Sequence, residues 1–173
     1  MAAHKYVLRI RLSADTTKID AEKGVISSVS VITEGPALGH FDWNSGKPLY
    51  VDAKTVTQVK ACAEEYGSGL KVKLDHYSGA GDIVGRLTGF RVEGNQLLAD
   101  LALLKNTPHR ALVLEMAETM PESFGLSIAF SGPAEVVGDK AYARCVEIYS
   151  ADIVDQPAAN PSGLFDAGGK GND

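Results

Sequence analysis

The chain has 173 residues, of which 45% are hydrophobic and 23% charged, with a formal net charge of -5 at pH 7. These values are typical of a single domain with one core. The acidic balance argues against a broad nucleic-acid-binding face. The apolar runs are shorter than the ~20 residues that a membrane helix needs. The first residues, MAAHKY, lack the apolar core of a signal peptide, so we expect a cytoplasmic protein.

The cysteine and histidine patterns favour neither a metal site nor a cofactor. Cys62 and Cys145 lie far apart and form no CxxC motif, and the histidines show no HExxH spacing. We therefore expect no metal and no cofactor, and we interpret both cysteines as buried small apolar residues.

The first third of the chain predicts two strands, a loop and a capped helix. Residues 6–12 alternate between apolar and other side chains, and residues 24–33 are rich in valine and isoleucine, so both segments predict strands. Glycine and proline punctuate residues 34–48, which predicts a loop. Asp52 is placed to cap a helix that runs through Tyr66.

The middle of the chain predicts a short strand, a hairpin and a second helix. Residues 70–74 form the short strand, and residues 83–92 and 96–104 form the hairpin around a Glu-Gly-Asn turn. Thr107 and Pro108 then predict the start of a helix that continues to about residue 120, with threonine as the cap and proline at the first helical position.

The last third predicts a second hairpin and an irregular tail. Residues 124–131 and 141–154 are its strands, and from residue 156 the chain is rich in Gly, Pro and Asn. We expect residues 1–165 to form one domain and residues 166–173 a flexible tail. Many strands and two helices predict a mainly antiparallel α+β fold. We expect its strands to form a closed or nearly closed β-barrel that is flanked by the helices.

The second hairpin places three polar residues on one face of its sheet. A turn centred between Gly138 and Asp139 pairs Ser127 with Ser150, so Ser127, Ser150 and Asp152 share a face. Ser127 and Asp152 are then diagonal neighbours, with Cβ atoms roughly 7 Å apart. An imidazole fits that gap and can bond a hydroxyl through one nitrogen and a carboxylate through the other. A slip of one residue would move Asp152 to the opposite face.

His76 is the preferred candidate for that imidazole. An unperturbed histidine suits a general base at neutral pH, and His76 follows a predicted strand and precedes the glycine-containing residues 77–81. His40, in the glycine-rich loop, is the main competitor. His4 lies near a terminus, and His109 lies at the start of a predicted helix.

Three motifs around these residues resemble a known family. They are LDH at residues 74–76, GLSIAF at residues 125–130 and SADIVDQPAANPSGLF at residues 150–165. In this order they resemble the signature blocks of the prohead proteases of tailed bacteriophages, the head-maturation serine proteases related to the herpesvirus capsid-maturation proteases (assemblins). The resemblance covers roughly residues 51–165.

The resemblance implies a fold and an activity. The fold is a mostly antiparallel β-barrel flanked by helices. The activity is that of a serine endopeptidase in host cytoplasm, inside the assembling procapsid, which cleaves the scaffolding protein, the N-terminal extension of the major capsid protein, and itself. The herpesvirus relatives suggest a homodimer, and neither nucleic acid nor membrane is an expected partner.

The same resemblance assigns roles to residues. Ser127 matches the nucleophile and His76 the general base. Family members differ in the third residue, and Asp152 matches its position best here, with Glu147 and Asp155 as alternatives. Many members have glycine where this chain has Ala129, which alters a place of close backbone approach.

Other interpretations of the same residues remain open. Asp152 could instead form a structural ion pair with Arg86 or Arg144. The chain could be a catalytically inactive factor that binds scaffold or capsid proteins on the same fold. A different Ser–His hydrolase is less favoured, because Ser127 lies in no GxSxG turn between a strand and a helix. Candidate oxyanion donors are backbone N–H groups near Ser127 or in residues 79–81.

Overall fold

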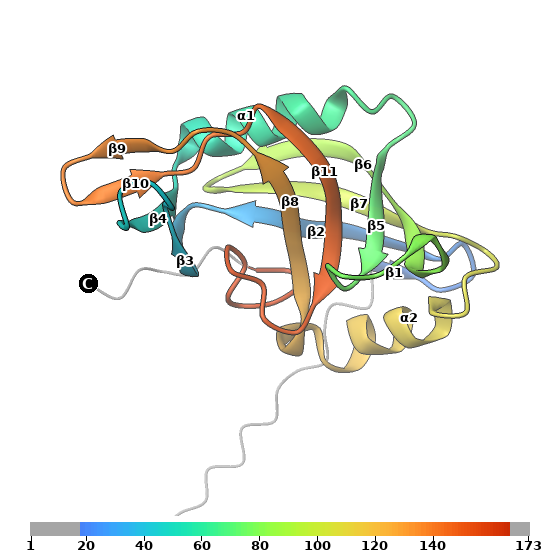
Figure 1. The fold of residues 1–173 in the computed structure, drawn as a ribbon. Helices are drawn as coiled ribbons and strands as arrows, with labels where there is room; N and C mark the ends of the chain where they lie inside the picture. Colours follow the sequence, from blue (N-terminus) through green and yellow to red (C-terminus); the bar gives the residue numbers. More distant parts are fainter. Residues whose placement is uncertain (1–17, 167–173) are drawn as a thin grey trace, which may run out of the picture.

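The computed structural model describes residues 18–166, which form two β-sheets and two α-helices (Figure 1). The expected α+β class is confirmed. The expected strand at residues 6–12 lies outside the described residues. The strands are β1 (Ile19–Asp20), β2 (Val25–Thr33), β3 (Gly35–Phe41), β4 (Pro48–Val51), β5 (Leu70–Leu74), β6 (Ile83–Glu93), β7 (Gln96–Leu103), β8 (Gly125–Ser131), β9 (Glu135–Val137), β10 (Lys140–Tyr142) and β11 (Glu147–Val154). The helices are α1 (Ala53–Glu64) and α2 (Arg110–Thr119), with short 3-10 turns at Ala80–Asp82 and Pro121–Ser123.

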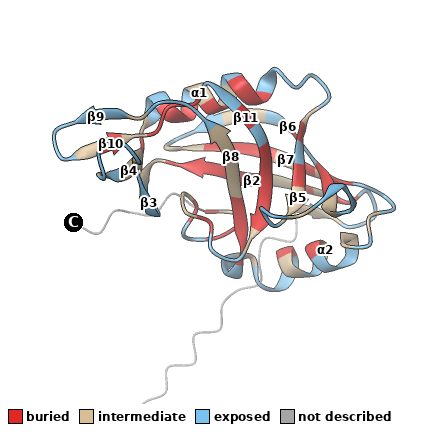
Figure 2. Ribbon diagram, viewed as in Figure 1, coloured by how far each residue is buried: buried red, intermediate tan, exposed pale blue. Residues whose placement is uncertain are grey.

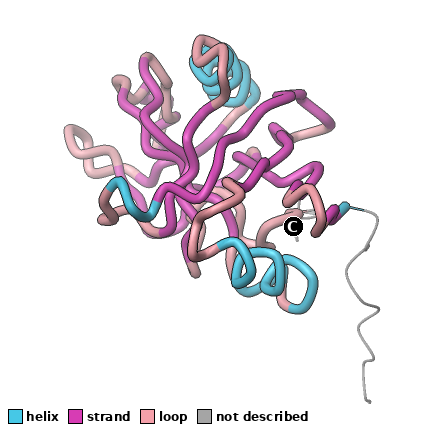
Figure 3. The backbone as a smooth tube through the Cα atoms, turned by 90° about the vertical axis from the view of Figure 1, so that its right-hand side faces the viewer, coloured by secondary structure: helices cyan, strands magenta, loops and turns pink. Residues whose placement is uncertain are grey.

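The larger sheet has seven strands in the order β1-β2-β7-β6-β5-β11-β8, and the smaller has the order β3-β4-β10-β9. All pairings in the larger sheet are antiparallel except that of β5 with β11. The helices α1 and α2 lie on opposite sides of the fold, at the top and the bottom of Figure 1, and the turned view of Figure 3 shows the same arrangement. The buried residues concentrate along the middle of the curved larger sheet (Figure 2). Neither helix within residues 18–166 is long and apolar enough to cross a membrane.

The larger sheet curves until its edge strand β8 lies near β2, but backbone pairing does not close it. Within residues 18–166, β1 and β8 remain the two edges. The side chain of Asn160 bridges the gap instead. Its Nδ2 donates to Val31 O on β2 at 3.0 Å and to Leu126 O on β8 at 2.8 Å. Its Oδ1 accepts from Ser30 Oγ at 2.7 Å and from Thr33 Oγ1 at 3.0 Å.

The chain after β11, residues 155–166, fills the same gap, and we call it the closing segment. Its backbone carbonyls accept from the N–H groups of β2 and β3: Leu164 O from Ser30 at 2.8 Å, and Ala158 O from Leu38 at 2.9 Å. Asn160 itself is fully buried. The closing segment therefore holds β8 against the rest of the fold in place of a strand.

The start of α1 is confirmed as predicted. Asp52 caps the helix by accepting from Thr55 N at 2.9 Å, and Arg144 adds bonds of 2.8 and 2.9 Å to the two carboxylate oxygens. Partial burial acts to raise the pKa of Asp52, but the hydrogen bonds from Arg144 and Thr55 outweigh it and lower that pKa to about 2. This cluster ties α1 to the chain between β10 and β11. The helix ends at Glu64, two residues before the expected end.

The prediction of a loop over residues 34–48 is wrong, because this segment contributes β3 and the start of β4 to the smaller sheet. Gly35 and Gly39 adopt positive φ values of 138° and 77°, and the register of β3 on β4 is irregular between Pro36 and Phe41. Glycine and proline that usually mark loops here bend a largely exposed strand.

The predicted start of the second helix is also wrong. The helix begins at Arg110, and His109 is its N-cap without a side-chain cap bond. Thr107 Oγ1 lies 3.4 Å from His109 N, in the turn before the helix. The two cysteines are buried and free, as predicted.

Replacement of Asn160 by alanine should destabilise the protein strongly. Four groups would each lose one buried hydrogen bond, which we expect to lower the free energy of unfolding by about 3 kcal/mol. Urea denaturation measures the loss. The matched control is Asn106→Ala in an exposed turn, with an expected change within about 0.5 kcal/mol. Equal effects of the two substitutions would contradict the bridging role of Asn160.

Candidate active site

The register of β8 on β11 places Ser127 directly opposite Asp152. The predicted pairing of Ser127 with Ser150 is therefore wrong by two residues, and so is the diagonal placement of Asp152. The turn at Gly138 and Asp139 does pair β9 with β10 as predicted, with Lys140 opposite Val137. The chain then leaves regular pairing before β11, and the register shifts again between Ile148 and Ser150.

An even shift leaves each side chain on its expected face. Ser150 pairs with Ala129, so Ser127, Ser150 and Asp152 lie on one side of the sheet, as predicted. The opposite side carries Leu126 and Ala151, both fully buried in the core. The polar face is thus the outer face of the curved sheet.

His76 lies against Asp152. It follows β5, which runs parallel to β11 with Leu74 beside Ile153. His76 Nδ1 is 2.6 Å from Asp152 Oδ2. The carboxylate side chain is 1% exposed and the imidazole 38% exposed. Because a carboxylate can only accept, we assign the proton of the neutral ring to Nδ1, which leaves Nε2 as the basic nitrogen.

The residue before His76 holds the loop in an unusual conformation. Asp75 has a φ of 69°, in the left-handed region, where aspartate is tolerated better than most residues. Its N–H donates to Ile153 O at 2.9 Å, and its Oδ1 accepts from His76 N at 2.7 Å. Ser78 Oγ donates to Asp75 O at 2.9 Å. Asp75 is therefore the residue that turns the chain from β5 toward Asp152.

Ser127 is half-buried on the edge strand and is not engaged by His76. Among residues 18–166 its Oγ makes no hydrogen bond, and Asp152 Oδ1 is buried without a hydrogen-bond partner. Strand pairing sets Ser127 and Asp152 at the separation of directly opposed residues, about 5 Å between Cβ atoms. The serine, the imidazole and the carboxylate therefore gather on one face.

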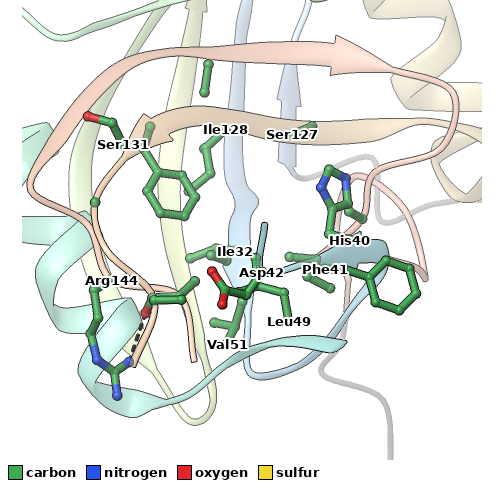
Figure 4. A pocket seen from close by; sticks show the side chains of 18 of the residues that line it. Ile32, His40, Phe41, Asp42, Leu49, Val51, Ser127, Ile128, Ser131 and Arg144 are labelled. Carbon is green, nitrogen blue, oxygen red and sulfur yellow. Dashed lines mark hydrogen bonds between the residues drawn. The ribbon is translucent and has the colours of Figure 1, made fainter. Parts of the chain in front are cut away.

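A cleft of about 490 Å³ runs along the open edge of β8 (Figure 4). Every residue from 126 to 134 contributes to its wall, so the cleft follows the edge of the strand rather than one face. The far wall comes from β3 and β4, with His40 and Phe41 visible on that side in Figure 4. The inner lining is mostly apolar and includes Ile32, Leu49, Val51 and Ile128.

A second cavity, of about 700 Å³, lies between α2, the end of β11 and the loop that follows His76. Its lining includes Asp75, Tyr77 and Met116 but not Ser127. It is larger, but none of Ser127, His76 and Asp152 lines it. The cleft along β8 is lined by Ser127, though by neither His76 nor Asp152, and is therefore the better candidate of the two for a binding groove.

The structure separates the remaining candidates. His40 lines the cleft with Ser127. Arg144 pairs with Asp52 and Glu135, and Arg86 donates to Ser68 O, so neither pairs with Asp152. Glu147 is exposed and accepts from the Tyr149 hydroxyl, and Asp155 lies beyond the end of β11 in the second cavity. Of the three acidic candidates, Asp152 is the one in contact with His76.

Sequence reasoning missed the β3 wall of the cleft and the role of Asn160. The wall was missed because glycine and proline made its strand resemble a loop. Asn160 lies inside the PAANP motif, between two prolines, and this motif was the signal available. Asn160 bonds Val31 and Leu126, which lie 129 and 34 positions away in the chain, and sequence spacing does not predict such contacts.

Comparison with protein-family models, with curated proteins and with solved structures finds no match to this chain.

The tautomer of His76 should depend on Asp152. In the neutral ring we expect the proton on Nδ1, and Asp152→Asn should shift it toward Nε2 because the substituted amide can turn its N–H₂ group to Nδ1. Long-range ¹H–¹⁵N correlation spectra distinguish the tautomers. His109, which faces Asp82 at 3.2 Å, serves as an internal reference with an unchanged spectrum. An Nε2–H tautomer in the unsubstituted protein would contradict the assignment.

Proposed function

We propose that this protein is a serine endopeptidase of the bacteriophage prohead protease kind, with an assemblin-like barrel whose seam is completed by the closing segment. The observation that carries the proposal is the 2.6 Å contact of His76 Nδ1 with the buried Asp152, directly across the ladder from Ser127. Serine, imidazole and carboxylate are the three groups that this chemistry requires. The three motifs of the family resemblance contain one each.

Each of the three residues has a defined task in the proposed reaction. Ser127 Oγ attacks the peptide carbonyl, His76 Nε2 accepts the hydroxyl proton, and Asp152 stabilises the imidazolium that forms. His76 then returns the proton to the leaving amine, and water hydrolyses the acyl-enzyme by the same route. Substrate entry must bring Ser127 Oγ and His76 Nε2 within hydrogen-bond reach, a tightening that is common when catalytic groups bind substrate.

The cleft suits an extended peptide. Within residues 18–166 the ladder partner of β8 is β11 alone, and beyond Leu126, whose carbonyl accepts from Asn160, the other edge of β8 faces the cleft. Such an edge can pair with the backbone of an extended substrate, while alternate side chains enter pockets. The apolar lining favours segments with apolar side chains near the scissile bond.

The expected substrates come from the family resemblance. They are the scaffolding protein, the N-terminal extension of the major capsid protein, and the protease itself, cleaved inside the procapsid. Extended segments of this kind can enter a cleft along an edge strand without unfolding a domain.

A second candidate function is a non-catalytic assembly factor that binds scaffold or capsid proteins in the same cleft. The observation that favours it is that Ser127 Oγ forms no hydrogen bond with His76 within the described residues. Ala129, in place of the family's common glycine, points the same way. The two functions differ in one measurable respect, namely whether bonds are cleaved.

Replacement of Ser127 by alanine should abolish processing. The protein is co-expressed with its scaffolding and major capsid proteins, and cleavage is followed on gels and by mass spectrometry. We expect a fall in cleavage rate of at least about 10³-fold, because the nucleophile is lost while the fold is kept.

Ser68→Ala is the control, since Ser68 is exposed and lines neither the cleft nor the second cavity. Its processing should stay near the original rate. Undiminished cleavage by the Ser127 variant would overturn the proposal, and absence of cleavage by the unsubstituted protein in assembled particles would favour the binding factor.

Obstruction of the cleft should weaken substrate binding and leave the rate of the cleavage step nearly unchanged. Ala37 lines the cleft from β3, and Ala37→Trp places a large ring there. We expect KM for a cleaved peptide to rise about tenfold, with kcat within about threefold of its original value. Ala37→Ser is the control of similar size. An unchanged KM for the tryptophan variant would show that substrate binds elsewhere.

A further inference from the structure

Lys73 extends the polar row that contains the candidate site. On the outer face, Ser127 of β8 pairs with Asp152 of β11, and Asp152 pairs in turn with Lys73 of β5. Directly paired residues of neighbouring strands share a face. The row across three adjacent strands is therefore serine, aspartate and lysine.

The ammonium of Lys73 contacts the loop that carries the imidazole. Lys73 Nζ donates to the backbone carbonyl of His76 at 3.1 Å. Within residues 18–166 it forms no ion pair, although Asp75 is two residues away in the chain and Asp152 lies opposite it on β11. The bond spans the turn at Asp75 and closes the loop back onto its own strand.

We infer that Lys73 is a positioning residue for His76, an inference that rests on the proposed function. The imidazole is bonded through Nδ1 to Asp152, and the loop backbone is bonded at two further points, by Asp75 to the His76 N–H and by Lys73 to the His76 carbonyl. These bonds restrain both the backbone and the ring of His76. A ring held this way presents Nε2 in one direction, which is the requirement for a general base.

Neighbouring Lys71 offers a matched comparison. It lies two residues earlier on the same strand and face and is exposed. It lies opposite Arg86 of β6, whereas Asp152 of β11 lies opposite Lys73. Both lysines carry the same charge on the same surface. Removal of Lys71 therefore reproduces the change in net charge without touching the His76 carbonyl.

The test compares Lys73→Met, Lys73→Arg and Lys71→Met in a peptide-cleavage assay and by proton NMR. For Lys73→Met we expect kcat to fall about tenfold with KM nearly unchanged, because binding is intact and the base is less well placed. Arginine can donate to the same carbonyl and should restore at least half of the activity. Lys71→Met should match the original protein.

The NMR measurement does not depend on catalysis. The downfield resonance of the His76 Nδ1–H proton should weaken or broaden in Lys73→Met and persist in Lys71→Met. An inactive unsubstituted protein would defeat the proposed function, yet this resonance would still decide the role of Lys73. The inference is overturned if Lys73→Met keeps both the original kcat and the original resonance, or if Lys71→Met loses them equally.

Discussion

The candidate site depends on the register of three neighbouring strands. Ser127 and Asp152 face each other because β8 and β11 are antiparallel, and His76 reaches Asp152 because β5 runs parallel to β11 and ends beside it. A shift of one residue in either pairing would send the carboxylate into the core face. β8 is an edge strand, so its position also needs support from its open side, and Asn160 supplies it through Leu126 O. The position of Ser127 on the outer face therefore depends on the buried Asn160 side chain, which bonds the same strand from its open side.

Burial of Asp152 is the energetic cost of this arrangement. A carboxylate that is 1% exposed, with one oxygen lacking a partner among the described residues, is unfavourable unless the other oxygen is strongly bonded. A fold selected for stability alone would place an apolar residue at this strand position. Arg144 and Asp52 form the contrasting case, since every charged group of that cluster is paired and the cluster joins elements of the fold.

Local patterns predicted the regular elements, and the contacts between them were harder to predict. The strand at Leu70–Leu74 and the cap at Asp52 were correct because alternation and capping act within a few residues. The pairing of Ser127 was wrong because a bulge and an irregular connection intervene between the turn and β11. The shared face survived this error because the shift was even. The bond between His76 and Asp152 joins residues 76 positions apart, and no spacing rule predicts it.

The closing segment limits where the chain could cut itself. In the proposed activity the protease is among its own substrates, yet residues 155–166 complete the seam that supports β8. A cut within this segment would separate Asn160 or Leu164 from the body of the protein and release the strand that carries the nucleophile. A cut beyond residue 166 would leave these contacts in place. In the proposed activity, self-processing at the first kind of position would remove the support of β8, whereas processing at the second would preserve it.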